Sequence, residues 1–186
     1  AEQWRSLVLG QPTTENVNKM VAAYMEKELT DTAFYGIVKE LLHNSNAETQ
    51  GLGLSAVSSF YNSTAFALTA ESYSVLPQDL QTKADAYLLG YANSGRLGIL
   101  ATSLKSSSTT VVSLATQLVI KGYQNAKSNV VTTDTRNRGG TGSTNTVASY
   151  TQFVSIFQTL SQSSDSEIAS LANSALSQIQ TGVASL

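Results

Sequence analysis

The chain has 186 residues, of which 11 are basic and 13 acidic, and it contains one His and no Cys. The formal net charge of -2 excludes a broad attractive field for nucleic acid or an anionic membrane. The lack of Cys excludes disulfides, thiolate zinc sites and a Cys nucleophile, and no apolar run is long enough to span a bilayer. Charged residues make up only 13%, against about a quarter in typical soluble domains, so hydroxyl and amide side chains must supply the polar surface.

Residues 1–30 are expected to form an N-terminal cap built on one helix. The stretch TENVNKMVAAYMEKEL has its apolar residues at the three-and-four spacing of a helix with one buried face. Those residues are Val17, Met20, Val21, Tyr24 and Met25. The segment around Trp4 stays unassigned.

Two segments far apart in the chain look like copies of one helix. They read SNAETQGLGLSAVSSF at 45–60 and SDSEIASLANSALSQI at 164–179. Apolar residues recur at matching positions with helical spacing, as in the pair Ala56 and Ala175. The match predicts that one structural unit is repeated along the chain.

Each copy also carries a signal for the start of a helix. Ser45 stands three residues before Glu48, and Ser164 three residues before Glu167. A Ser and a Glu at this spacing satisfy free backbone N–H groups reciprocally at a helix N-terminus. We therefore expect Ser45 and Ser164 to cap equivalent helices.

The repeated unit is predicted to be a helix pair. Segments starting at Pro77 and Ser108 fit the same template, and a shorter apolar-periodic stretch precedes each of the four helices. The pairs begin near Asp31, Thr64, Gly95 and Thr146. A spacing of about thirty residues is typical of an α-solenoid.

This pattern gives an all-α chain with one helical-repeat domain spanning residues 1–186. Three helix pairs occupy residues 31–126, a flexible insertion loop occupies 127–145, and a C-terminal pair occupies 146–186. The stacked antiparallel pairs form a HEAT/armadillo-like superhelix whose units share one core.

The run LLGYANSGRLGILATSLKSSSTTVVSLATQLVIKGY resembles the short, roughly thirty-residue HEAT-like repeats, and SSDSEIASLANSALSQI resembles their inner helix. Asp165 falls at the turn, and Glu167 and Ile168 fall where the family pattern has an acid and an aliphatic residue. The Arg that usually follows the first aliphatic residue is absent. In its place stand Gln50, Thr82, Val112 and Ala169. An armadillo-like array and a compact helical bundle therefore remain alternatives.

Five glycines fall inside predicted helices: Gly51, Gly53, Gly90, Gly98 and Gly122. A helical Gly costs up to about 1 kcal/mol relative to Ala. Either neighbouring helices approach closely at these positions, or the packing merely tolerates the cost.

The interruption between Lys127 and Thr146 is the candidate binding loop. Arg136 and Arg138 lie beside two glycines there, so their guanidinium groups could grip a carboxylate or a phosphate. The alternative is a solvated insertion without a partner. The Gly-rich GGTGST lacks the Lys of a phosphate-binding loop, so no nucleotide and no other cofactor is expected.

Three tyrosines on predicted helices are further binding candidates: Tyr87, Tyr91 and Tyr123. Tyr is common at recognition sites because it combines a large area with a polar tip. The alternative is that most of these rings pack between helices.

Catalytic constellations are not evident. His43 is the one histidine and lies at a predicted helix end, where capping or simple exposure is expected. No nucleophile elbow is present, and no carboxylate pair is placed in a pocket by the pattern. Asn62 begins an Asn-Ser-Thr glycosylation tripeptide, which matters only in a glycosylating pathway.

The HEAT-like resemblance implies a non-enzymatic scaffold that binds a protein or peptide partner. The low net charge disfavours nucleic acid as a partner, and no cofactor is expected. The surface composition favours a secreted, periplasmic or cell-envelope location, with the cytoplasm as the alternative. A second hypothesis is a small-ligand-binding protein or enzyme that uses the loop at 127–146. A structural spacer or assembly subunit is the third.

Overall fold

The computed structural model describes residues 2–93, 95–132 and 145–186. These residues form α-helices and two short 3-10 helices and contain no strand, which confirms the all-helical prediction. The elements are α1 (Glu2–Gly10), α2 (Thr14–Met25), α3 (Asp31–Leu42), α4 (Ala47–Val57), α5 (Ser63–Ser72), η1 (Tyr73–Val75), α6 (Gln78–Asn93), α7 (Leu97–Ser103), α8 (Thr109–Thr132), η2 (Val147–Gln152), α9 (Phe153–Leu160) and α10 (Ser166–Ala184).

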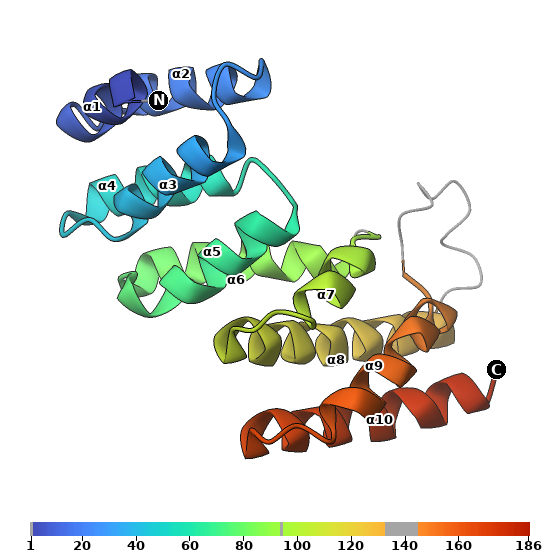
Figure 1. The fold of residues 1–186 in the computed structure, drawn as a ribbon. Helices are drawn as coiled ribbons and strands as arrows, with labels where there is room; N and C mark the ends of the chain where they lie inside the picture. The colour runs from blue at the N-terminus through green and yellow to red at the C-terminus, as the bar shows by residue number, and fades with distance from the viewer. Residues whose placement is uncertain (1, 94, 133–144) are drawn as a thin grey trace. The chain divides into compact units, whose positions relative to one another are not determined.

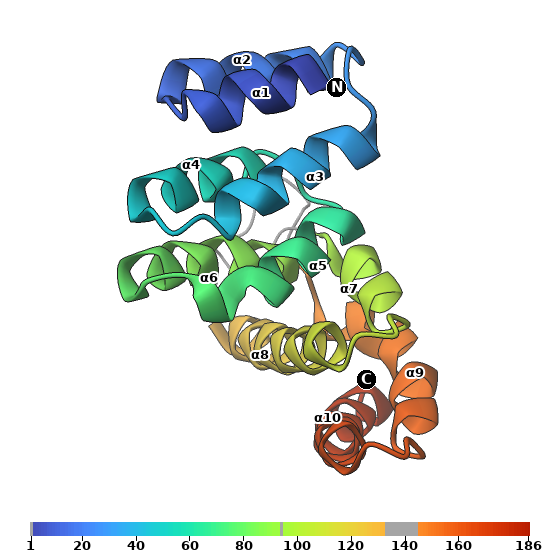
Figure 2. The same cartoon turned by 60° about the vertical axis from the view of Figure 1, so that its left-hand side comes forward.

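The chain divides into two compact units, Ala1–Tyr87 and Leu88–Leu186, with the boundary inside α6. In unit 1, α1 packs on α2 and α3, α2 on α3 and α4, and α3 on α4 and α5 (Figures 1 and 2). In unit 2, α8 packs on α7, η2 and α10, and α10 also covers η2 and α9. The helices in these contacts thus pack against elements that are close to them in chain order.

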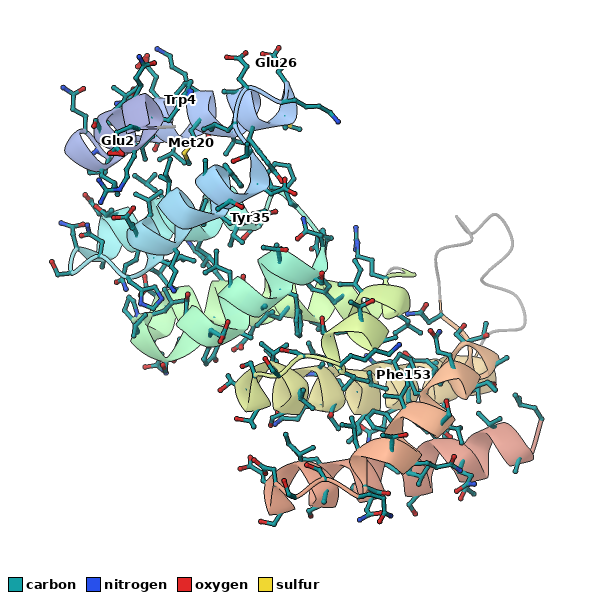
Figure 3. All side chains as sticks on the ribbon, viewed as in Figure 1. Glu2, Trp4, Met20, Glu26, Tyr35 and Phe153 are labelled. Carbon is teal, nitrogen blue, oxygen red and sulfur yellow. The ribbon has the colours of Figure 1, made fainter. Side chains whose placement is uncertain are left out.

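The core of unit 1 gathers the apolar faces of its successive helices. Met20 of α2 is fully buried and lies between the α1–α2 pair and the α3–α4 pair (Figure 3). The Tyr24 ring stacks on Phe34 with centroids 4.0 Å apart, and its hydroxyl donates to Asp31 Oδ1 at 2.6 Å. Burial, with the hydrogen bond to Asp31, raises the pKa of Tyr24 above its usual range. This aromatic contact joins α2 to α3.

The core of unit 2 is built around a row of fully buried rings. Tyr123 of α8 meets Tyr150 of η2 edge to face, with centroids 5.7 Å apart. Tyr150 is followed by Phe153 at 5.8 Å, and Phe153 stacks on Phe157 at 6.0 Å. The 3-10 helix places Tyr150 and Phe153 one turn apart, so both rings face the same side. Figure 3 marks Phe153 where η2 passes into α9.

The two segments that resemble each other in sequence do start their helices in the same way. In α4 the side chain of Asn44 accepts from the N–H of Asn46 at 2.8 Å, and Asn46 Oδ1 accepts from the N–H of Thr49 at 3.1 Å. In α10 the matching bonds join Ser163 to Asp165 and Asp165 to Ile168, both at 3.1 Å. We call this two-bond arrangement the capping turn.

The capping turn occurs a third time, at the start of α8. Ser106 Oγ accepts from the N–H of Ser108 at 3.0 Å, and Ser108 Oγ accepts from the N–H of Val111 at 3.3 Å. The helix predicted from Pro77 begins without a side-chain cap in the described contacts, because proline occupies the position before Gln78. Three of the four second helices therefore share one local geometry.

The predicted caps Ser45 and Ser164 are wrong by one residue in both copies. Asn46 and Asp165 are the N-cap residues of α4 and α10. Asn and Asp are as effective as Ser at the N-cap position. The backbone N–H of the N-cap residue is bound by a side chain two residues earlier, Asn44 or Ser163. This bond places the helix start one residue later than the Ser-x-x-Glu pattern predicts. Both helices begin with the same two hydrogen bonds, one residue later than predicted.

Asp165→Ala is expected to destabilise unit 2 by about 1 kcal/mol, since it leaves the N–H groups of Glu167 and Ile168 without their acceptor. Ser164→Ala, which removes the residue that the sequence predicted as the cap, should change stability by less than about 0.5 kcal/mol. Thermal unfolding followed by circular dichroism compares the two. An equal effect of both substitutions would contradict the assignment of Asp165.

Two element boundaries differ from the sequence prediction. The unassigned segment around Trp4 is helix α1, whose apolar face is too short to show helical periodicity in the sequence. Helix α8 continues to Thr132, beyond Lys127 where the loop was predicted to begin. The prediction of a loop over the following residues lies outside the described residues.

Two of the helical glycines mark close helix contacts. A Cβ at Gly53 would lie 2.8 Å from Leu41 Cβ, and one at Gly122 would lie 3.0 Å from Ala92 Cβ. Gly98 has nothing within 4 Å, so there the packing merely tolerates the glycine. Close helix contacts therefore explain Gly53 and Gly122, whereas the packing tolerates Gly98 without such a contact.

A bidentate ion pair connects α1 to α3. Arg5 Nε and Nη2 donate to the two carboxylate oxygens of Glu40 at 2.7 and 2.6 Å. The hydrogen bonds from Arg5 hold the pKa of Glu40 below its ordinary value of 4.5. A carboxylate whose folded pKa is depressed stabilises the fold above its unfolded pKa, and this contribution is lost as the pH falls through the folded pKa. Both side chains are largely exposed, so the contribution is small and sensitive to salt.

We expect α1 to loosen as the pH falls below about 4.5. Trp4 is the one tryptophan of the chain and lies partly buried on α1, so its fluorescence reports this change directly. Glu40→Gln should shift the emission to the red already at neutral pH and weaken the acid transition. Glu71→Gln removes an exposed carboxylate elsewhere in unit 1 and should behave as wild type. Identical acid transitions in all three proteins would contradict the role of the pair.

Candidate functional site

The binding residues predicted from the sequence do not form an exposed site in the described residues. Arg136 and Arg138 lie outside those residues. Tyr87, Tyr91 and Tyr123 are 6%, 0% and 2% exposed, so their rings pack in the core, which was the alternative reading. The Tyr87 hydroxyl donates to the Phe60 carbonyl at 2.6 Å. A recognition surface lined by these three rings is therefore not supported.

His43 has a structural place. It is the C-cap residue of α3 and is exposed, and its Nε2 lies 3.0 Å from Ser72 Oγ. Ser72 is fully buried, so its hydroxyl is not accessible to a substrate. The Asn62 amide is engaged as well: Oδ1 accepts from the N–H of Ala65, and Nδ2 donates to Tyr35 Oη at 2.9 Å. Attachment of a glycan at Asn62 would displace the bond to Tyr35.

A hollow of about 400 Å³ in unit 2 is the candidate site that the structure presents. It lies between the end of α6, one face of α8 and Asn145, two residues before η2. We call it the asparagine hollow. Its lining consists of small and amide-bearing residues: Ala92, Asn93, Gly122, Asn125, Ala126, Ser128 and Asn145.

The local backbone explains why these amides meet. Residues 122, 125, 126 and 128 share one face of α8, because residues three or four apart are neighbours on a helix. Asn145 is fixed by its Nδ2, which donates to the Ala92 carbonyl at 2.5 Å. This carbonyl belongs to the last turn of α6, where carbonyl groups have no partner within the helix. Asn145 therefore borders the hollow while its side chain binds a free carbonyl at the C-terminal end of α6.

The floor of the hollow is Gly122, with a buried phenol directly behind it. A Cβ at residue 122 would lie 2.5 Å from Tyr150 Oη. Tyr150 is fully buried, and its hydroxyl interacts with the Asn145 side chain without forming a well-aligned hydrogen bond. Burial raises the pKa of Tyr150 to about 12, against a smaller opposing effect of the Asn145 amide. The phenol therefore stays neutral at physiological pH.

The described lining of the hollow consists of uncharged side chains. Its described lining contains no Asp, Glu, His, Lys or Arg, and residues 2–93, 95–132 and 145–186 contain no group of three side chains suited to hold a metal ion. Amide and hydroxyl groups donate and accept hydrogen bonds but remain uncharged near neutral pH.

Sequence reasoning missed the asparagine hollow. Asn93, Asn125 and Asn145 are far apart in the chain and share no motif. The signal that was available is Gly122, which was noted as a costly helical glycine and lies one turn before Asn125. Only the packing of α6 against α8 at Ala92 turns that glycine into the floor of a site.

Comparison with known proteins adds no assignment: no protein-family model, no curated protein and no solved structure matches the chain. Among the described helices, none combines the length and the apolar character needed to cross a membrane.

Proposed function

We propose that this protein is a non-enzymatic interaction module, an α-solenoid of helix pairs that binds a protein or peptide partner on its helical surface. The observation that carries the proposal is the packing order. Within each unit, the helices contact elements close to them in the chain. Packing of this kind is characteristic of repeat arrays, in which extended surfaces serve for recognition.

The capping turn gives independent support for a repeated unit. The pairs Asn44 and Asn46, Ser106 and Ser108, and Ser163 and Asp165 make the same two bonds at the start of α4, α8 and α10. The sequence resemblance to short HEAT-like repeats points in the same direction. The step from a repeat fold to a binding role is an analogy between folds, and it rests on that resemblance. An exported or envelope location belongs to the same proposal.

The proposal is tested by quantitative capture of partners from the native extract. The immobilised chain should retain a protein in near-equal molar amount, and cross-linking with mass spectrometry should place the contact on helical residues. Arg136→Ala with Arg138→Ala tests the predicted binding loop. Lys39→Ala with Lys121→Ala removes the same charge from exposed helical positions and is the matched control.

The capture experiment tests the interaction role and the assignment of Arg136 and Arg138 separately. Capture of no protein above background would contradict the interaction role. Retention of the partner by the Arg136 and Arg138 variant, at the level of the control, would contradict only the assignment of these two residues.

A second candidate function is the binding of a small ligand, and the asparagine hollow favours it. The volume of about 400 Å³ lies within the range of about 300–1,000 Å³ that is usual for ligand sites. This function also agrees with the second hypothesis from the sequence, which placed a ligand near residues 127–146.

A further inference from the structure

We propose that copies of this chain associate head to tail, with the acidic surface of unit 1 in one copy against the basic surface of unit 2 in the next. The inference goes beyond the proposed function, because it concerns contact between copies of the chain and requires no other partner. Three observations carry it: the opposite charges of the units, the segregation of acidic and basic residues along the chain, and the exposed charges that form no ion pair.

The two units carry charges of opposite sign. Unit 1 has five basic and ten acidic residues, which gives a formal net charge of -5, and unit 2 has six basic and three acidic residues, which gives +3. The described residues of unit 2 include four basic and two acidic side chains, so its positive sign does not depend on the others. Each unit therefore offers the charge that the other attracts.

Acidic and basic residues are also segregated along the chain. Residues 40–82, which include α4 and α5, contain four acidic residues and no Lys or Arg. Residues 86–133, which include α7 and α8, contain four basic residues and no Asp or Glu. We call these segments the acidic stretch and the basic stretch. Each stretch contributes charge of a single sign to the surface of its unit.

The basic stretch presents charge on an exposed face of α8. Lys121, Gln124 and Lys127 are exposed and follow one another at steps of three residues, so they are neighbours on the helix. Lys105, between α7 and α8, is exposed as well. Because α8 contains no Asp or Glu, no carboxylate on the same helix offsets the charge of this face.

The exposed charges of both stretches are available to a second molecule. The ion pairs between described residues involve Arg5 and Lys19 of unit 1 as their cations. Six exposed side chains of the two stretches form no ion pair with a described residue: Glu48, Glu71, Asp79, Lys105, Lys121 and Lys127. A second copy of the chain supplies the opposite charge to each set. A nucleic acid or an anionic membrane is less suited, because the acidic unit 1 repels a polyanion.

Contact between unlike surfaces has a consequence for the size of the assembly. A pair of copies leaves one acidic and one basic surface free at its two ends, so further copies can add there. Exposed ion pairs are individually weak. We therefore expect an open association that depends on protein concentration and is sensitive to salt.

Sedimentation velocity of the full chain tests the inference at ionic strengths of about 0.01 M and about 1 M, where charges act over about 30 Å and about 3 Å. At the lower ionic strength, the weight-average mass should rise above that of the monomer as the protein concentration increases. At the higher ionic strength, it should return to the mass of the monomer.

Two triple variants locate the contact. The first reverses the basic stretch through Lys105→Glu, Lys121→Glu and Lys127→Glu. The second reverses the acidic stretch through Glu48→Lys, Glu71→Lys and Asp79→Lys. Each variant alone should be monomeric at the lower ionic strength, with a circular dichroism spectrum that matches the wild type. An equimolar mixture should associate again, because the first variant retains the acidic stretch and the second retains the basic stretch.

The matched control changes the net charge by the same amount as the first variant. It reverses exposed residues of unit 1 through Lys27→Glu, Lys39→Glu and Lys83→Glu. The control should still associate, because its basic stretch is intact and its unit 1 is more acidic. Loss of association in the control, to the same extent as in the first variant, would assign the effect to net charge and overturn the inference.

Three further results would overturn the inference. The first is a wild-type chain that stays monomeric at both ionic strengths, including one whose basic stretch binds a double-stranded oligonucleotide instead. The second is association that strengthens with salt, since this indicates an apolar contact. The third is a mixture of the two charge-reversed variants that remains monomeric.

Discussion

Replacing Gly53 by Ala is expected to destabilise unit 1 by about 2 kcal/mol. The new Cβ would lie 2.8 Å from Leu41 Cβ, 3.0 Å from the Leu42 backbone N and 3.2 Å from the Leu41 carbonyl carbon. These atoms belong to the helix backbone of α3 or are fixed to it, so they cannot rotate away. The α3–α4 pair must separate, which loosens a core that includes the fully buried Leu41. The gain of up to about 1 kcal/mol from better helix propensity offsets only part of this cost.

Gly51→Ala is the matched control for this prediction. Gly51 lies in the same helix, but its Cβ would meet only Leu80 Cδ2 at 3.6 Å, an ordinary contact. The substitution should therefore stabilise unit 1 by about 0.5–1 kcal/mol through the propensity of Ala. Urea unfolding followed by Trp4 fluorescence measures both variants. Equal stability of the two proteins would contradict the close contact of α3 with α4 at Gly53.

Gly182→Ala is expected to destabilise unit 2 by about 2 kcal/mol, because its Cβ would overlap the hydroxyl of Tyr123. Tyr123 is 2% exposed, so its ring has little room to move aside. Its hydroxyl also lacks a hydrogen-bond partner in the described part of the chain. The overlap therefore forces α10 away from α8.

A second substitution, Tyr123→Phe, tests the contact between Gly182 and Tyr123 when it is made alone and together with Gly182→Ala. Alone it removes an unpaired buried hydroxyl, and it should be neutral or stabilise unit 2 by up to about 1 kcal/mol. In the double variant, most of the loss of unfolding free energy caused by Gly182→Ala should disappear. A part of the loss should remain, because the Cβ would still lie 2.7 Å from Tyr123 Cζ. Unfolding followed by far-ultraviolet circular dichroism measures this cycle. Strictly additive effects would contradict the proposed contact.

Helix positions were predictable because apolar residues recur at helical spacing over long stretches. The pairs starting near Asp31, Thr64 and Gly95 correspond to α3, α5 and α7, whose first residues are Asp31, Ser63 and Leu97. Helix α1 was missed because nine residues with Val8 as their one buried side chain carry little periodicity. Its position depends on contacts with α2 and α3, which a local pattern does not contain.

Helix starts were predictable only to within one residue. Ser45 and Asn46 are both good capping residues, and the choice between them depends on the backbone turn. That turn is set by the bond from the N–H of Asn46 to Asn44 Oδ1. The same ambiguity, with the same outcome, occurs at Ser164 and Asp165.

The candidate site was the least predictable part. The tyrosines singled out for binding are amphipathic, and the same property suits them to the core, where Tyr91 is fully buried. The asparagine hollow arises from the end of α6, one face of α8 and Asn145. No sequence spacing relates these three elements, because their approach depends on the packing at Gly122.

The central claim is that the helices are stabilised by elements near them in the chain. Residue-resolved hydrogen exchange of the Gly182→Ala variant tests this claim most directly. We predict faster exchange in α8, α9 and α10, with unchanged protection in α2, α3 and α4. A uniform loss of protection through every helix would show a single cooperative core and would contradict the neighbour-by-neighbour architecture on which the proposed interaction role rests.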